Sequence, residues 1–312
     1  MNLLVTIIAP VFGVVVIGFL AVRLRLLGPV GTRRIVLFVF NAAIPIMLFQ
    51  RLAAITFPDR IEWGFLFAFY GGALTVLALG IVVARFGFRR PLDEQAIFGM
   101  GAGFSNTVLL GIPLLLTAFG PEAELPVFMI IAFHSATLLP VSIALIQAGQ
   151  QAREEAVTVR VAKLAMEVLA NPIIAGIVLG LLVNFAGVTL AGPIQAAAEL
   201  ISTVAIPCAL IALGGSLAAY PLRGDLGPAA VLAALKLTVH PCIAWVIAVP
   251  SLGLGVPWAP VAVVMAGMPS GALVYLFSAR YQTATDVAAR TVLVSSAASI
   301  LTLSVLLVLM GA

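Results

Sequence analysis

Long apolar runs separated by short polar connectors make up nearly the whole chain. A bilayer core about 30 Å thick is crossed by roughly 20 apolar residues in a helix, and a window of that length selects ten segments. The runs are continuously apolar rather than alternating, so they predict helices and not the strands of a barrel. The predicted spans are 3–22, 34–57, 63–84, 95–119, 125–148, 168–188, 194–219, 228–249, 258–281 and 287–310.

Composition points to the same class of protein. Of the 312 residues, 63% are hydrophobic and only 9% are charged, whereas about a quarter of a soluble domain is charged. The sequence therefore predicts an integral membrane protein. Residues 3–22 lack a basic leader and a small-residue cleavage site, which favours a retained first span over a signal peptide.

The positive charges are distributed one-sidedly. Thirteen of the 16 Lys and Arg residues fall in alternate connectors, beginning with the one after the first span. Basic connectors stay in the cytoplasm, so both termini are predicted to lie outside, with the protein in the bacterial cytoplasmic (inner) membrane. These residues are Arg23, Arg25, Arg33, Arg34, Arg85, Arg89, Arg90, Arg153, Arg160, Lys163, Arg223, Arg280 and Arg290.

Two short motifs recur in the same order. AIPIML at 43–48 returns as AIPCAL at 205–210, and AGFSN at 102–106 returns as AGMPS at 266–270. Because each half holds five spans, an odd number, the halves would have opposite orientations, as in many secondary transporters. We therefore expect an all-α protein of two inverted five-helix repeats, 1–148 and 168–312. Residues 149–167 are expected to form a cytoplasmic amphipathic linker.

The fourth and ninth spans each combine polar residues with helix breakers. Proline interrupts a helix, and freed backbone groups at membrane depth must be buried or face a cavity. We expect breaks at Gly111–Pro113 and at Met268–Gly271. Two antiparallel broken helices would cross at the midplane and direct two helix N-termini inward, which favours an anion. The expected substrate-binding residues are Ser105, Asn106, Thr107, Pro113, Pro269 and Ser270.

These motifs together resemble the auxin efflux carrier family, bacterial relatives of the plant auxin exporters. The resemblance rests on Asn106 with Gly111 and Pro113, on MPSGALV at 268–274, on AIPCALIALGGSLA at 205–218 and on NPIIAGIVLGLLVNFAGV at 171–188. It implies crossover helices four and nine in a bile-acid-symporter/NhaA-like fold. It also implies auxin-like or small dicarboxylic acids as substrates, an elevator-type motion of a transport domain against a scaffold, and a homodimer.

Lys236, His134, His240 and Asn41 also lie inside predicted spans, and Asn41 is read either as a packing residue or as part of a cavity lining. Lys236 lies about 12 Å from the cytoplasmic end of its span, at 1.5 Å per residue, too deep for easy snorkelling. It would either complement an anionic substrate or pair with carbonyls released by the crossover. His134 and His240 are each read either as packing residues or as proton-coupling groups.

Other function classes find less support in the sequence. No Asp or Glu lies near the middle of a span, which disfavours antiport through paired carboxylates. Neither a zinc-binding motif nor a nucleotide-binding loop is apparent, so we expect neither an enzyme nor an ATP-driven pump, and no cofactor, metal or nucleic acid. The sequence predicts a secondary transporter of organic anions; the alternative is a sodium-coupled, bile-acid-symporter-like carrier on the same scaffold.

Overall fold

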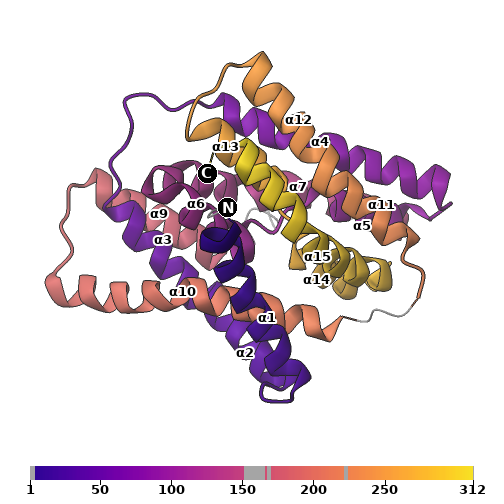
Figure 1. Ribbon diagram of the computed structural model, residues 1–312, viewed down its shortest axis with the longest axis horizontal. Helices are drawn as coiled ribbons and strands as arrows, with labels where there is room; N and C mark the ends of the chain where they lie inside the picture. Colours follow the sequence, from indigo (N-terminus) through magenta and orange to yellow (C-terminus); the bar gives the residue numbers. More distant parts are fainter. Residues whose placement is uncertain (1–3, 151–165, 167–169, 221–223, 312) are drawn as a thin grey trace.

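The computed structural model describes residues 4–150, 166, 170–220 and 224–311, and their regular structure is helical (Figure 1). The elements of the first half are η1 (Leu4–Ile8), α1 (Ala9–Arg23), α2 (Pro29–Phe38), η2 (Val39–Ala43), α3 (Ile44–Ala53), α4 (Gly64–Val82), η3 (Val83–Gly87), α5 (Leu92–Gly103), η4 (Thr107–Gly111), α6 (Ile112–Phe119), η5 (Gly120–Ala123) and α7 (Glu124–Gly149). Those of the second half are α9 (Pro172–Phe185), α10 (Gly192–Ala219), α11 (Gly227–Ala234), η6 (Leu235–Val239), α12 (His240–Val246), η7 (Ile247–Ser251), α13 (Trp258–Ala266), α14 (Ala272–Tyr281) and α15 (Thr285–Leu309).

Seven helices in the described ranges are long and apolar enough to cross a membrane, so the protein is an integral membrane protein with several spans. The shorter α9 is also apolar. The segments predicted at 95–119 and 258–281 are each interrupted, which divides them into pieces too short to qualify alone. The long helices are Thr6–Arg23, Pro29–Ala53, Gly64–Gly87, Thr107–Gly149, Gly192–Ala219, Gly227–Ser251 and Thr285–Leu309.

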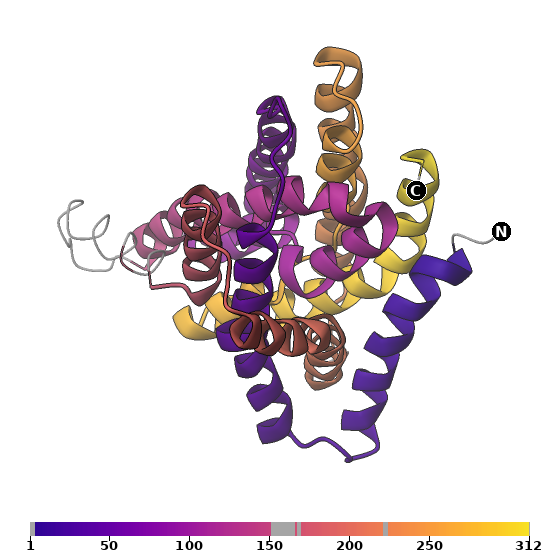
Figure 2. The ribbon, with the colours of Figure 1, turned by 90° about the vertical axis from the view of Figure 1, so that its left-hand side faces the viewer.

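Most of the predicted linker at 149–167 lies outside the described residues, as do Arg153, Arg160, Lys163 and Arg223. The two ends of the described chain lie close together, since η1 contacts α15 (Figure 2). The N-terminal end of the first helix and the C-terminal end of the last helix therefore lie on the same side of the molecule.

The helices form two groups that pack mainly within themselves. In the first body, α1 packs on α10, α3 packs on α9, and α10 crosses α2 and α3. In the second body, α4 packs on α5 and α12, α5 packs on α7, and α15 packs on α11 and α14. In Figure 1 the first body fills the left and lower part of the view and the second body the right and upper part. η4 and α6 contact both bodies.

Small residues bring the helix backbones of the first body into direct contact. A Cβ atom added to Gly214 of α10 would collide with the backbone of Val15 in α1, and one added to Gly176 of α9 would collide with the carbonyl of Pro45 in α3. Close backbone approach through small residues is a common way of packing helices in a membrane, where lipid tails weaken the hydrophobic drive.

Three π-helical turns share one arrangement. η2, η4 and η6 each end two residues before a proline, namely Pro45, Pro113 and Pro241. Proline lacks an N–H and its ring collides with the carbonyl four residues earlier, and the wider π turn relieves that conflict because its bonds span five residues. Each helix therefore continues past its proline.

This arrangement corrects one prediction. The fourth span does not break at Gly111–Pro113; the interruption falls at residues 104–106, and Pro113 lies within the first turn of α6. The polar residues themselves form the break, while the proline is accommodated by η4 and by its place early in the helix. The ninth span is interrupted between α13 and α14, at residues that include Pro269, as predicted.

Candidate functional site

The two interruptions meet and are joined by backbone hydrogen bonds. The N–H of Asn106 donates to the carbonyl of Pro269 at 2.8 Å, and the N–H of Gly271 donates to the carbonyl of Phe104 at 2.9 Å. Ser105 and Ser270 thereby form an isolated antiparallel bridge. Much of the backbone freed by the breaks is thus satisfied by the other break, which makes the irregular segments tolerable at membrane depth.

A neighbouring helix holds each serine of this bridge. The N–H of Ser105 donates to Nε2 of His134 on α7 at 3.1 Å, and the N–H of Ser270 donates to Oγ of Ser295 on α15 at 3.1 Å. The side chains differ: Ser270 Oγ donates to the carbonyl of Gly101 at 2.6 Å, whereas Ser105 Oγ is buried without a partner. The second-half serine is therefore fully engaged, and the first-half serine keeps its hydroxyl free.

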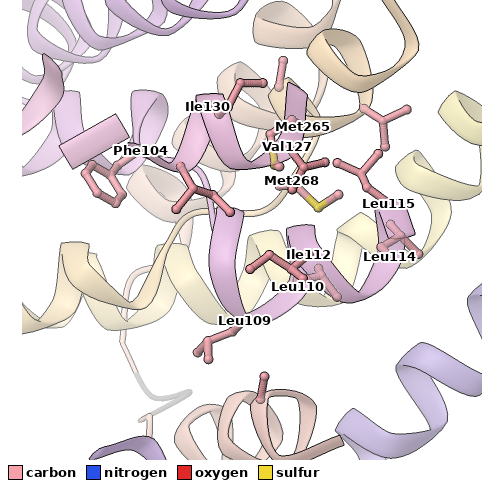
Figure 3. Packing of buried hydrophobic residues seen from close by; sticks show 14 of the residues in the cluster. Phe104, Leu109, Leu110, Ile112, Leu114, Leu115, Val127, Ile130, Met265 and Met268 are labelled. Atoms are coloured by element: carbon pink, nitrogen blue, oxygen red, sulfur yellow. The ribbon is translucent and has the colours of Figure 1, made fainter. Parts of the chain in front are cut away.

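Apolar packing fixes the segment that follows the first interruption. Figure 3 shows Ile112, Leu114 and Leu115 of α6 beside Val127 and Ile130 of α7 and Met265 and Met268 of the second interrupted span. All of these side chains are buried. The position of the η4 N-terminus is therefore set by a packed core and not by a mobile loop.

A cavity of about 300 Å³ adjoins this crossing, between the first and second bodies. It is bounded on one side by the crossover segments and α7, and on the other by α2, η2 and the start of α9. Its lining residues are Val36, Leu37, Phe40, Asn41, Phe104–Leu109, Ile131, Ala132, His134–Ala136, Asn171, Ile173, Ile174, Gly271–Leu273 and Leu276.

Hydrogen-bond donors are concentrated on the crossover side of this cavity. The first amides of a helix have no partner within it and carry the positive end of its dipole; η4 and α14 both begin at the cavity lining. Asn106 is only 4% exposed, and its Nδ2 has no partner. Nδ1 of His134 is also buried without a partner. An unsatisfied buried donor is costly, so this wall is suited to an acceptor-rich ligand.

The cavity wall carries no fixed charge. Among the described residues that line it there is no Lys, Arg, Asp or Glu, and His134 is the sole imidazole. Because Nε2 of His134 accepts the bond from Ser105, the neutral ring carries its hydrogen on Nδ1. His134 thus presents a neutral N–H, and its predicted role in proton coupling stays a prediction.

Lys236 and His240 lie away from this cavity. Lys236 is completely buried; its Nζ donates to the carbonyl of Ala266, the last residue of α13, and lies 3.0 Å from Nδ1 of His240. Nε2 of His240 lies 3.1 Å from the carbonyl of Phe69 on α4 and must donate to it. Of the two alternatives for Lys236, the structure displays the pairing with a crossover carbonyl.

Of the remaining predicted site residues, some line the 300 Å³ cavity and others hold the two interrupted spans together. Ser105, Asn106 and Thr107 line the cavity together with His134. Pro113, Pro269 and Ser270 do not line it; Pro269 and Ser270 hold the crossing through their backbone and hydroxyl bonds.

Two asparagines of the first body also line the cavity; the sequence offered cavity lining for Asn41 as the alternative to packing, and it did not single out Asn171. Asn41 lies in η2, and Asn171 precedes α9 and accepts a bond from the N–H of Ile173 at 2.9 Å. Both line the cavity opposite the crossover. An asparagine just before a proline signals a helix start, but nothing in that local pattern reveals the distant residues that it faces.

A second, larger cavity of about 870 Å³ lies at the other end of α3. Arg51 of α3 forms an ion pair there with Glu124, the first residue of α7. This pair joins the two bodies. The 300 Å³ cavity lies instead beside Val36 of α2 and Asn171 at the start of α9, near the beginnings of the predicted spans 34–57 and 168–188, each of which follows a predicted cytoplasmic connector.

Several apolar spans, two interrupted helices that cross, and a cavity at the crossing define a polytopic membrane transporter. Residues 3–307 match the sequence profile of the family described as membrane transport protein, and the chain belongs to that family, which confirms the resemblance to the auxin efflux carriers. A protein of Rhizobium meliloti (strain 1021) named "Putative malonate transporter" is 25% identical over 311 residues, covering 97% of this chain and 94% of that protein.

Proposed function

We propose that the protein is a secondary transporter that carries small organic anions, with short dicarboxylates such as malonate as its substrates. The observation that carries the proposal is the unpartnered Asn106 Nδ2 beside two helix N-termini, at a cavity whose described lining residues include no Asp or Glu. A carboxylate would satisfy these donors, since anions bind readily at helix N-termini. The relative named for malonate supports this substrate class.

The proposed architecture is ten spans in two inverted repeats, 1–148 and 168–312. The packing supports it, because an operation that exchanged the two halves would place α1 on α9 and α3 on α10. The contact between α1 and α10 would thereby become the contact between α9 and α3, and both contacts are present. The two serine anchors, His134 for Ser105 and Ser295 for Ser270, also occupy corresponding places.

Transport would proceed by alternating access, with the second body moving against the first in an elevator-type motion. The cavity between the two bodies and the Arg51–Glu124 pair on the opposite side correspond to a state open toward the cytoplasm. The proposal also includes the location of the protein: it lies in the inner membrane, with both termini outside. It assembles as a homodimer. Efflux is the direction that the family resemblance favours.

The test is transport by purified protein in liposomes, measured as currents on a solid-supported membrane with malonate and other carboxylates. We expect a saturable response that Asn106→Ala abolishes. Asn184→Ala is the matched control, because Asn184 donates to the carbonyls of Ala53 and Ile55 and does not line the cavity. A response that requires sodium would instead favour the symporter alternative, and folded protein that responds to no carboxylate would contradict the proposal.

A further inference from the structure

The cavity has polar groups on two facing walls, separated by apolar side chains. The crossover wall carries Asn106 and the two helix N-termini, and the wall of the first body carries Asn41 and Asn171. Leucine, isoleucine, valine and phenylalanine side chains make up much of the remaining lining. A ligand that reached both walls would therefore have a polar group at each end.

The crossover wall balances about one negative charge. Each helix N-terminus acts as roughly half a positive charge, so η4 and α14 together complement a single carboxylate. No Lys or Arg among the described lining residues supplies a second positive charge. A doubly ionised dicarboxylate would bring one charge more than the site complements, and an unpaired charge in such surroundings is expensive.

The opposite wall is suited to a neutral polar group. The Oδ1 of Asn171 is committed to the N–H of Ile173, which leaves its Nδ2 as a donor. Asn41 offers both an amide donor and a carbonyl acceptor. A protonated carboxyl group also donates and accepts, whereas an ionised carboxylate only accepts. Two asparagines therefore match –COOH or a primary amide better than they match –COO⁻.

We propose that the site takes a short dicarboxylic acid as its monoanion: the ionised carboxylate lies at the crossover and the protonated carboxyl lies at Asn41 and Asn171. This inference rests on the proposed function, because it describes the ionisation state in which the same site accepts its substrate. Asn41 and Asn171 then determine specificity, separating half-protonated dicarboxylates from monocarboxylates with an apolar tail.

His134 is the titratable group that faces the ligand among the described lining residues. Lys236 and His240 lie away from the cavity and bond to each other and to the carbonyls of Ala266 and Phe69. A pH dependence of binding could thus arise from the ligand or from His134, and the experiment must separate the two.

The experiment measures binding to the purified full-length protein in lipid nanodiscs with three probes of similar size. Malonate changes from monoanion to dianion as the pH rises, malonamate is a monoanion with a neutral amide at its other end, and propionate is a monoanion with a methyl group there. We expect the apparent affinity for malonate to fall about tenfold for each pH unit above the second pKa of malonic acid. The affinity for malonamate should stay constant over the same range. A pH dependence shared by malonamate would assign the titration to the protein and overturn the proposal.

Two variants test the second wall. Asn41→Leu removes an amide, and Asn171→Ser removes the other but keeps a capping oxygen for α9. We expect each variant to weaken the binding of malonamate and of half-ionised malonate about tenfold, and to leave the binding of propionate unchanged. Equal losses for all three probes would overturn the specificity role. If malonate binds through Asn106 but malonamate does not bind, this inference fails alone; if no carboxylate binds, the proposed function fails with it.

Discussion

The N–H of Asn106 donates to the carbonyl of Pro269 at 2.8 Å and joins the two interrupted spans. The bond engages the backbone of Asn106 and leaves its side-chain Nδ2 unpartnered at the cavity. A single residue thus holds the crossing together and offers a donor to a ligand, and substitutions that separate these two roles are the most informative.

The two bridge serines provide such a separation. Ser270→Ala removes a buried bond to the Gly101 carbonyl, so we expect a loss of about 1 kcal/mol of stability with little change in ligand affinity. Ser105→Ala removes a hydroxyl that has no protein partner, so we expect unchanged stability and weaker carboxylate binding. Thermal unfolding and ligand titration of both variants check this. The reverse assignment of effects would contradict it.

Lys236→Met should destabilise the protein more than it affects binding. The substitution leaves the carbonyl of Ala266 and the Nδ1 of His240 without a donor, and a buried group that loses its partner costs about 1–3 kcal/mol. Thermal unfolding gives the stability, and carboxylate titration well below the unfolding temperature gives the affinity. A variant of normal stability that no longer binds carboxylates would instead place Lys236 in charge complementation of the substrate.

The Arg51–Glu124 pair should stabilise the state in which the 300 Å³ cavity faces the cytoplasm, because it joins the two bodies on the opposite side. Arg51→Glu and Glu124→Arg should each raise the apparent affinity for substrate added outside, and the charge-swapped double variant should restore the original value. Arg51 keeps its partial contact with solvent, and a solvent-screened ion pair contributes about 0.2–1 kcal/mol, which sets an effect of up to about fivefold. Effects of the two single variants that simply add would exclude a coupled pair.

Contact between α1 and α10 depends on the absence of a side chain at Gly214. Gly214→Ala should cost about 1–3 kcal/mol because the new Cβ must displace the backbone of Val15. Gly13→Ala is the matched control: it lies in α1 with open space around its Cβ, and should raise stability by up to about 1 kcal/mol. Unfolding midpoints in detergent distinguish the two. Equal effects would show that helix propensity, not packing, governs both positions.

Features carried by long stretches of sequence were predictable. Continuous apolar runs placed the helices near their observed ends. The helix-breaking residues located the second interruption but misplaced the first within its span. Ser105, Asn106, Thr107 and His134 were expected to be important and do line the cavity. The helix predictions succeeded because the length of an apolar run is a local signal, whereas substrate binding by these four residues stays a prediction.

Features that depend on neighbouring helices were not predictable in the same way. Proline at position 113 suggested a break, but the π turn of η4 absorbs it and the break lies at residues 104–106. For Lys236 the sequence favoured a role toward the substrate over pairing with the crossover, and its contact with the carbonyl of Ala266 depends on a distant helix that no local pattern reveals. Asn41 and Asn171 gain their interest from a cavity that forms between two bodies.

The π turns before Pro45, Pro113 and Pro241 have a consequence for how such a protein tolerates insertions and deletions. Each turn holds one residue more than an α-helical turn, so deleting one residue there would bring back the conflict at the proline and rotate everything on one side by about 100°. Asn41 and Lys236 lie within two of these turns. A single lost codon would therefore turn Asn41 away from the cavity that it lines, or Lys236 away from the interior, without shortening the span appreciably.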